Sequence, residues 1–377
     1  MNQHEYFGDG CIANLRDVLN AMNSERIFLV TGKKSYGSSG AEKIVSEILK
    51  DSSVFQFSDF SENPKIEDIK KGIDIFNSSS CDTVITVGGG SVIDMAKSVN
   101  ILASQPSGIE SIIKDNSKII NKGKRLIAVP STSGAGSEAT HFAVVYIGKE
   151  KHSLAHDKIL PDVSIIDPTL TYRLPSNVTA TSGIDAFSQA IESYWNVNAT
   201  SDSKKYASES IRLILNNLTG AVNDPDGANR SRMSEAAHLA GKAINITKTT
   251  APHAISYSMT SYFGIPHGQA VCITLAEFLE YNFNVTENDV TGGRNPDDVK
   301  STFDELLHLL ECKNIADGKR KITELIISIN LKTRLSEIGI AGESVNIIAE
   351  NVNTERLNNN PRIVTPASLR QILNNIL

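Results

Sequence analysis

The first half of the chain alternates apolar, β-branched runs with amphipathic stretches, and this alternation constrains the fold more than any other feature. Strand character is found at 26–31, 54–57, 83–87 and 126–129, and helical patterns fill 41–49 and 66–76 and begin again at Ser91. Strands that alternate with helices build a parallel sheet covered on both faces. The sequence therefore predicts an α/β domain in the first half.

The second half has a different texture. From about Pro175 onward helical patterns dominate, at 176–196, 202–218, 230–246, 268–283, 300–312, 319–337 and 343–351. A chain of 377 residues is long for one core and fits two domains. We therefore expect an α/β domain at 1–174 and an all-helical domain at 175–377.

Charge and cysteine usage narrow the classes of function. The net charge is −6 with no basic block, which argues against a nucleic-acid partner. No apolar run approaches the roughly 20 residues that a membrane helix needs, and the first residues do not resemble a secretion signal. The four cysteines form no C-x-x-C pair and indicate reduced thiols. We expect a cytoplasmic protein with neither nucleic-acid nor membrane partners.

Two glycine-containing loops follow predicted strands. Gly88-Gly89-Gly90-Ser91 ends one strand and opens a helix, where a phosphate can approach the backbone and the free N–H groups. Residues 130–138, P-S-T-S-G-A-G-S-E, form the second loop. A tight turn and a polar loop are the structural alternatives, but the carboxyl ends of parallel strands favour ligand binding. Asp94 and Lys97, on the helix after the first loop, could pair with each other or contact the cofactor.

Four polar residues in the second half form a candidate metal site. Asp185 and Gln189 are four residues apart in a predicted helix, so both side chains lie on one face. His253 and His267 could complete a divalent-metal site with them. Each residue alone is more often an ordinary polar side chain, and the combination with the glycine loops carries the prediction.

These motifs together resemble the iron-containing (group III) alcohol dehydrogenases. The resemblance rests on G-G-G-S-V-I-D-M-A-K, P-S-T-S-G-A-G-S-E, the D-P step at 167–168, G-I-D-A-F-S-Q-A-I-E and P-H-G-Q-A, in the family's order and spacing. It implies an N-terminal Rossmann-like domain with a parallel sheet that binds a dinucleotide, at 1–174, and an all-α C-terminal domain that binds metal and substrate, at 175–377. The active site is then expected between them, a layout shared with dehydroquinate synthase. The family's ligands, one Asp and three His, correspond to Asp185, Gln189, His253 and His267.

The resemblance also implies cofactor contacts in the first half. By position these are Asn63, Gly89, Gly90, Ser91, Thr132, Ser133 and Lys151. The acidic residue that favours NAD in the family is replaced by Gly32, followed by Lys33 and Lys34. Loss of a carboxylate and gain of cations suit a 2′-phosphate, so we expect NADPH, with NADH as the alternative. Two solvated surface lysines are the structural alternative.

Two further departures concern the catalytic machinery. Gln189 replaces a ligand histidine, and an amide oxygen is the weaker ligand, so the ion could be Zn²⁺ in place of Fe²⁺. Tyr257 stands where many members have a histidine credited with proton relay. Its hydroxyl is then the candidate acid, with a metal-bound water or the cofactor's ribose hydroxyls as alternatives. Tyr257 and the ligand His267 are therefore the expected catalytic residues.

The surroundings of the expected ligands resemble the branch that reduces phosphonoacetaldehyde in phosphonate biosynthesis. Lys248 and Thr249 could bind the phosphonate, although an exposed lysine is the alternative for Lys248. We expect an NAD(P)H-dependent alcohol dehydrogenase or aldehyde reductase that assembles as a homodimer or larger homo-oligomer. Another small aldehyde, or a dehydroquinate synthase-like lyase acting on a phosphorylated sugar, are the alternatives. A binding protein that has lost a ligand histidine is a third, supported by Gln189 alone.

Overall fold

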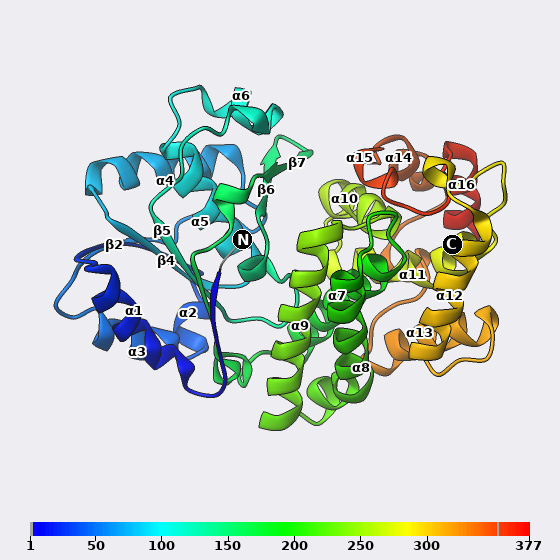
Figure 1. Cartoon of the computed structure of the whole chain (residues 1–377), viewed down its shortest axis with the longest axis horizontal. Coiled ribbons are helices and arrows are strands. Elements are labelled where there is room, and N and C mark those ends of the chain that lie inside the picture. Colours follow the sequence, from blue (N-terminus) through cyan, green and yellow to red (C-terminus); the bar gives the residue numbers. More distant parts are fainter. Residues whose placement is uncertain (1–2, 353) are drawn as a thin grey trace. The chain divides into compact units, whose positions relative to one another are not determined.

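The computed structural model describes residues 3–352 and 354–377. The chain divides into two compact units, Met1–Leu174 and Pro175–Leu377. The first unit is built around a sheet, and the second is built from helices (Figure 1).

The first unit contains a six-stranded sheet in which all neighbouring strands pair in parallel. The strand order is β1-β8-β5-β4-β2-β3. The bounds are β1 His4–Phe7, β2 Arg26–Thr31, β3 Ser53–Phe57, β4 Thr83–Gly88, β5 Arg125–Pro130 and β8 Val163–Ile166. The carboxyl ends of β5, β4 and β2 are therefore neighbours at one edge of the sheet.

Neighbouring residues of the central strands enter two separate cores. Phe28 of β2 and Val84 of β4 belong to one cluster of buried residues, while Leu29 and Ile85 belong to another. Successive side chains of a strand point to opposite faces, so both faces of the sheet are covered, as the apolar strand sequences predicted. β3 lies at the edge and is more exposed than the fully buried β4.

Helices and a hairpin complete the first unit. The α-helices are α1 Leu15–Met22, α2 Ser35–Ser38, α3 Ala41–Ile48, α4 Ile66–Ser79, α5 Gly90–Ala103 and α6 Ile109–Lys114. Short 3₁₀ helices lie at Cys11–Asn14, Asn116–Lys118, Ser137–Ala139, Asp157–Ile159 and Pro168–Thr171. An antiparallel hairpin, β6 Phe142–Ile147 and β7 Glu150–Ala155, was not predicted.

The second unit consists of helices, with one isolated bridge between Val290 and Arg362. The helices are α7 Ser176–Trp195, α8 Ser201–Asn223, α9 Gly227–Thr247, α10 Ala251–Phe263, α11 His267–Phe283, α12 Pro296–Leu309, α13 Ile315–Ser328, α14 Ser344–Glu350, α15 Thr354–Leu357 and α16 Pro366–Asn375, with 3₁₀ helices at Thr291–Gly293 and Ser336–Ile338. The predicted fold class, a parallel α/β unit followed by an all-helical unit, is confirmed.

Helix α7 is the most deeply buried element of the second unit. All its residues from Gly183 to Trp195 are buried. A Cβ atom on Gly183 would lie 2.3 Å from Leu218 Cδ1 of α8, so this position needs glycine for close helix packing. The Trp195 ring stacks on Phe303 of α12 at 5.6 Å between centroids. Polar residues on α7 are therefore held in a rigid interior.

The helical pattern at 319–337 is a wrong prediction from residue 329 onward, nearly half of its length. Helix α13 ends at Ser328, and Asn330 adopts the left-handed conformation with φ 62°. Asparagine tolerates this conformation better than other residues that have a side chain, and it stops the helix there. The sequence also failed to reveal α10 and α16.

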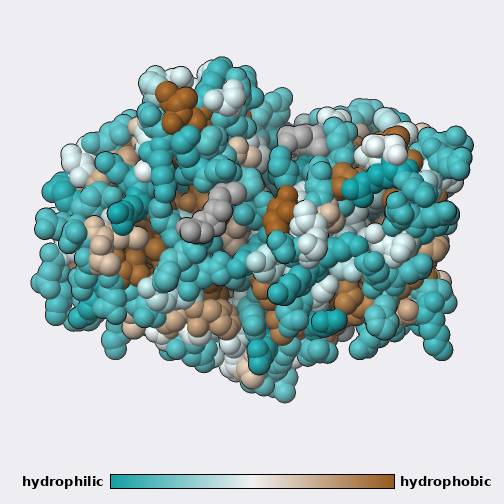
Figure 2. Space-filling model, in the orientation of Figure 1, coloured by the Kyte–Doolittle hydropathy of each residue, from teal (hydrophilic) through white to brown (hydrophobic). Residues whose placement is uncertain are grey.

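Surface and thiol chemistry are simple. The face drawn in Figure 2 is mainly hydrophilic, with hydrophobic residues in scattered groups. None of the helices in the described residues combines the length and apolar character needed to cross a bilayer. All four cysteines are free.

The Lys97 side chain is buried in the first unit and braces the second glycine loop. It is 1% exposed and donates hydrogen bonds to Ser137 O, Thr140 O and Phe142 O, and to Thr140 Oγ1. Burial lowers the pKa of Lys97 to about 8, against the raising effect of Asp94 and Glu138. Asp94 accepts from the Val144 N–H. Lys97 therefore stabilises the loop, in place of the cofactor contact considered from the sequence.

Replacing Lys97 with Met should lower the free energy of unfolding by about 3 kcal/mol, because three buried carbonyls lose their donor and Asp94 loses its cation. Chemical denaturation measures this loss. Ser98→Ala is the matched control, since Ser98 Oγ is buried without a hydrogen-bond partner among the described residues. Equal stability of the Lys97→Met variant and the parent would contradict the bracing role.

Candidate metal centre and cofactor loops

Helix α7 presents Asp185 and Gln189 from the interior of the second unit. Asp185 is 5% exposed and Gln189 is 3% exposed. The Gln189 Nε2 amide donates to Asp185 Oδ2 at 3.3 Å, as expected for side chains one turn apart. An amide has oxygen and nitrogen on opposite sides, so a half-turn of the group would direct its oxygen to the same place.

The two histidines come from the first turns of neighbouring helices. His253 is the third residue of α10, and His267 is the first residue of α11. Pro252 fits the first turn of α10 because its missing N–H has no helical partner there. Helices α10 and α11 pack together, and the imidazole centroids are 5.4 Å apart.

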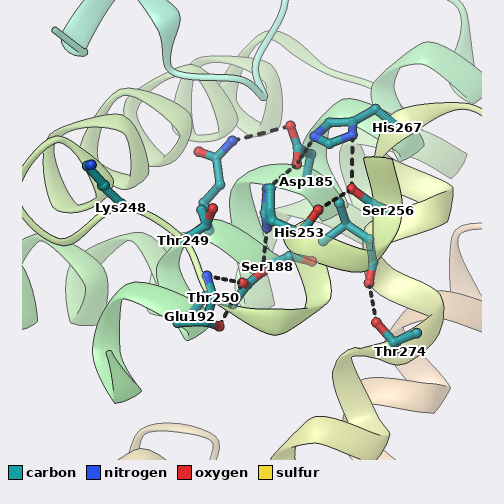
Figure 3. Close-up of polar contacts among 12 residues, drawn as sticks. Asp185, Ser188, Glu192, Lys248, Thr249, Thr250, His253, Ser256, His267 and Thr274 are labelled. Atoms are coloured by element: carbon teal, nitrogen blue, oxygen red, sulfur yellow. Dashed lines mark hydrogen bonds and ion pairs between the residues drawn. The ribbon is translucent and has the colours of Figure 1, made fainter. Parts of the chain in front are cut away.

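Asp185, His253 and His267 converge on one point (Figure 3). Asp185 Oδ1 lies 3.2 Å from His253 Nε2 and 3.7 Å from His267 Nε2. One ligand atom from each of the three residues lies within 4.8 Å of the others. Bonds of about 2.0–2.1 Å to a tetrahedral ion put ligand atoms roughly 3.3 Å apart, so the observed spacing fits a divalent metal.

Glu192 lies behind His253 and was missed in the sequence. This α7 carboxylate is fully buried and accepts a hydrogen bond from His253 Nδ1. Burial alone would lower the pKa of His253, but Glu192 and Asp185 reverse this effect and raise it to about 10. Glu192 lies seven residues, or two turns, beyond Asp185, so the sequence alone places both side chains on one face of the helix. Nothing local in the sequence pairs Glu192 with a histidine 61 residues away.

Two α10 residues contact the second imidazole. Ser256 Oγ lies 3.4 Å from His267 Nδ1 and donates to His253 O at 2.8 Å. The Tyr257 ring stacks on His267, with centroids 6.1 Å apart and planes 17° from parallel. Tyr257 is 8% exposed, so the predicted acid lies beside a predicted metal ligand in the protein interior.

The predicted substrate residues stand between α9 and α10, in a strained segment. Lys248 has φ 63° and ψ −171°, a backbone conformation used almost only by glycine. Its N–H donates to Ile244 O at 2.7 Å, and its carbonyl accepts from Thr247 Oγ1 at 2.7 Å and Asn196 Nδ2 at 3.2 Å. Thr249 O accepts from Asn359 Nδ2 at 3.0 Å. Figure 3 shows Lys248 to one side of the Asp185–histidine cluster.

The predicted cofactor residues gather within the first unit, at the carboxyl ends of β4 and β5. The Asn63 N–H donates to Ser91 Oγ at 3.3 Å, at the start of α5. A Cβ on Gly89 would lie 3.2 Å from Thr132 Cγ2, and one on Gly90 would lie 2.7 Å from Ala135. The two glycine loops are therefore in contact, with Ser133 buried next to Thr132.

Lys151 joins this group through the hairpin. It pairs in register with Tyr146, whose N–H donates to Pro64 O at 2.8 Å beside Asn63. Gly32 follows β2, and a Cβ there would lie 2.1 Å from Ser35 Oγ, which would have to turn away. Lys33 forms an exposed ion pair with Asp59 at 2.6 Å.

Comparison with known proteins decides the family. The profile described as "Iron-containing alcohol dehydrogenase" matches residues 2–168, and "Fe-containing alcohol dehydrogenase family, C-terminal" matches residues 179–377. The chain belongs to the iron-containing alcohol dehydrogenase family. It is therefore an oxidoreductase, as predicted.

Several relatives share a large part of their length with this family member. "Probable alcohol dehydrogenase EutG" of Escherichia coli is 33% identical over 82% of this chain and 76% of that protein. "Phosphonoacetaldehyde reductase" of Streptomyces viridochromogenes is 30% identical over 78% of this chain and 75% of that protein. The structure of sulfoacetaldehyde reductase from Bifidobacterium kashiwanohense in complex with NAD⁺ has TM-score 0.87, 28% identity, and coverage of 99% and 96%. These names favour a redox enzyme over the lyase alternative.

Removing either imidazole should abolish tight metal binding by this family member. For His253→Ala and His267→Ala we expect zinc affinity to fall more than about 100-fold, beyond the cost of losing an outer-shell partner. Elemental analysis after dialysis measures the bound metal. His308→Ala, an exposed histidine on α12, is the control. Unchanged metal content in the first two variants would contradict the site.

Proposed function

We propose that this chain reduces phosphonoacetaldehyde to 2-hydroxyethylphosphonate, with NADPH or NADH as the hydride donor. Membership of the family establishes the alcohol dehydrogenase class, and the proposal adds the substrate. Two of the similar proteins carry names of reductases for two-carbon aldehydes with an oxyanion, phosphonate in one and sulfonate in the other. Their common chemistry, an anion one carbon from the aldehyde, is what a site in this chain must recognise.

The strained backbone of Lys248 carries the substrate assignment. A lysine at φ 63° and ψ −171° costs about 1–3 kcal/mol, and such strain tends to persist at functional sites. Three hydrogen bonds to the Lys248 backbone hold it there, directly before Thr249 and the α10 helix that carries His253. An ammonium with a neighbouring hydroxyl is suited to a phosphonate. We infer that Lys248 and Thr249 bind the anionic end of the substrate.

The divalent ion, Fe²⁺ or Zn²⁺, would be held by Asp185, His253 and His267. Gln189 would join them once its amide has turned. A bound dication supplies Lewis-acid polarisation of the carbonyl. His267 has a side chain that is 35% exposed, against 5% for His253, so substrate would enter on its side. Tyr257, stacked on His267, is the proposed donor of the proton to the alcohol oxygen.

The first unit would bind the dinucleotide. Asn63, Ser91 and the contact between Gly89 and Thr132 form the proposed phosphate and nicotinamide site, at the edge of the sheet where α/β domains bind nucleotides. We propose NADPH as the preferred donor, because Lys33 and Lys34 follow β2. The exposed Lys33–Asp59 pair contributes little and can open to admit a 2′-phosphate.

We further propose a cytoplasmic enzyme that assembles as a homodimer or larger homo-oligomer. Four free thiols are suited to a reducing compartment. Its place would be phosphonate biosynthesis, after a reaction that forms the aldehyde.

A substrate panel tests the proposal. Initial rates with phosphonoacetaldehyde, propanal, glycolaldehyde and lactaldehyde should be measured with NADPH and with NADH. We expect the highest kcat/KM with phosphonoacetaldehyde and NADPH. Equal values across the aldehydes would remove the phosphonate assignment and leave the dehydrogenase class intact.

Lys248→Gly separates anion recognition from structure. Glycine adopts the Lys248 backbone angles without strain, so the variant should not unfold at a lower temperature than the parent. Loss of a charge-assisted contact should lower kcat/KM for phosphonoacetaldehyde about 10- to 100-fold and leave propanal unchanged. Lys248→Arg, which keeps the cation, is the matched control. An equal loss with both aldehydes would contradict the assignment.

A further inference from the structure

The Glu192 carboxylate is the most deeply buried anion near the proposed metal site. It is fully buried and uses both oxygens: Oε1 accepts from His253 Nδ1, and Oε2 accepts from the Thr250 N–H at 2.7 Å and Thr250 Oγ1 at 2.8 Å. Trp195 Nε1 in turn donates to Thr250 Oγ1 at 3.0 Å. Burying a carboxylate is costly, and hydrogen bonds alone rarely compensate for it without a nearby cation.

The helices around the proposed metal site increase the contribution of the Glu192 charge to cation binding. His253 and His267 stand in the first turns of α10 and α11, which contain 13 and 17 residues. Helix N-termini carry partial positive charge and disfavour a dication beside them. Asp185 supplies one negative charge, and Gln189 supplies none. A second buried carboxylate, Glu192, would offset more of the charge of a dication.

The hydrogen-bond pattern also places a proton on the Nδ1 nitrogen of His253, which leaves Nε2 as the nitrogen that can lose its proton to a metal. A carboxylate can only accept, so His253 Nδ1 must donate to Glu192. The other nitrogen, Nε2, points at Asp185 Oδ1, where the ion would lie. A ligand imidazole needs its metal-facing nitrogen free of hydrogen, and the second nitrogen usually donates to a carboxylate or carbonyl.

We infer that Glu192 is a positioning residue of the metal centre: it orients His253 for binding through Nε2, and its charge strengthens binding of the dication. Thr250 and Trp195 hold Glu192 in place. This inference rests on the proposed metal site and gives Glu192 no contact with substrate.

Glu192→Gln is the decisive variant because an amide has a single acceptor atom. If that oxygen faces Thr250, the NH₂ group faces His253 Nδ1 and forces the histidine proton onto Nε2. If it faces His253, the Thr250 N–H loses its acceptor. Either way the charge is gone. We expect zinc affinity, measured by competition with a chromophoric chelator, to fall about 10- to 100-fold.

Thermal unfolding separates this role from a structural one. In EDTA, Glu192→Gln should unfold at a lower temperature than the parent, because the buried His253 loses its carboxylate partner. With zinc added, its stabilisation should be clearly smaller than the parent's. Thr250→Val keeps the charge and should lose less zinc affinity than Glu192→Gln. Ser188→Ala, one turn earlier on α7 and bonded to Ile184 O at 2.8 Å, is the control for perturbing the helix.

Two outcomes would overturn the inference. Parent-like zinc affinity of Glu192→Gln, while His267→Ala loses its zinc, would leave the metal site intact and remove the role of Glu192. Earlier unfolding in EDTA with an unchanged zinc-induced gain would mark Glu192 as purely structural. If His267→Ala keeps parent-like affinity, the metal site itself fails.

Discussion

The convergence of one carboxylate and two imidazole nitrogens, inside a helical unit, is the interaction on which the rest of the account depends. The side chains of such a group must be held close together by the surrounding structure. Helix α7 is buried from Gly183 to Trp195, so Asp185 and Glu192 are fixed by packing. The first turns of α10 and α11 bring the histidines to them. Packing around α7 thus holds two buried carboxylates, Asp185 and Glu192, close to the histidines, where a dication would offset their charge.

In the first unit, backbone groups shape the proposed cofactor site. Glycines at the end of β4 allow the second glycine loop to approach within van der Waals distance. Lys97 holds the end of that loop and the residues after it through the carbonyls of Ser137, Thr140 and Phe142. Because the Lys97 ammonium bonds to these carbonyls, it does not occupy the N-terminus of α5. The free N–H groups there can bind a phosphate. Each unit therefore has a buried charged side chain, Lys97 or Glu192, next to the residues that we propose bind ligands.

Periodicity was sufficient to predict the architecture, because β-branched strands and long amphipathic helices report their own burial. The side-chain contact between Asp185 and Gln189 was also predictable from their four-residue spacing on one helix. Glu192 and Thr250 were not, because their roles arise from contacts between α7 and the start of α10, a helix whose apolar pattern is interrupted by serines. The strain at Lys248 was equally hidden, since a lysine in a glycine conformation leaves no local signal. The end of α13 depended on one asparagine at positive φ.

X-ray absorption at the zinc edge of the loaded protein tests the central claim most directly. The account predicts four light ligands at about 2.0–2.1 Å, with the outer-shell scattering of two imidazoles and no sulfur. His267→Ala should remove one imidazole contribution from any residual bound metal. A spectrum with sulfur at about 2.3 Å, or with oxygen ligands and no imidazole scattering, would contradict the assignment of Asp185, His253 and His267 as the metal centre.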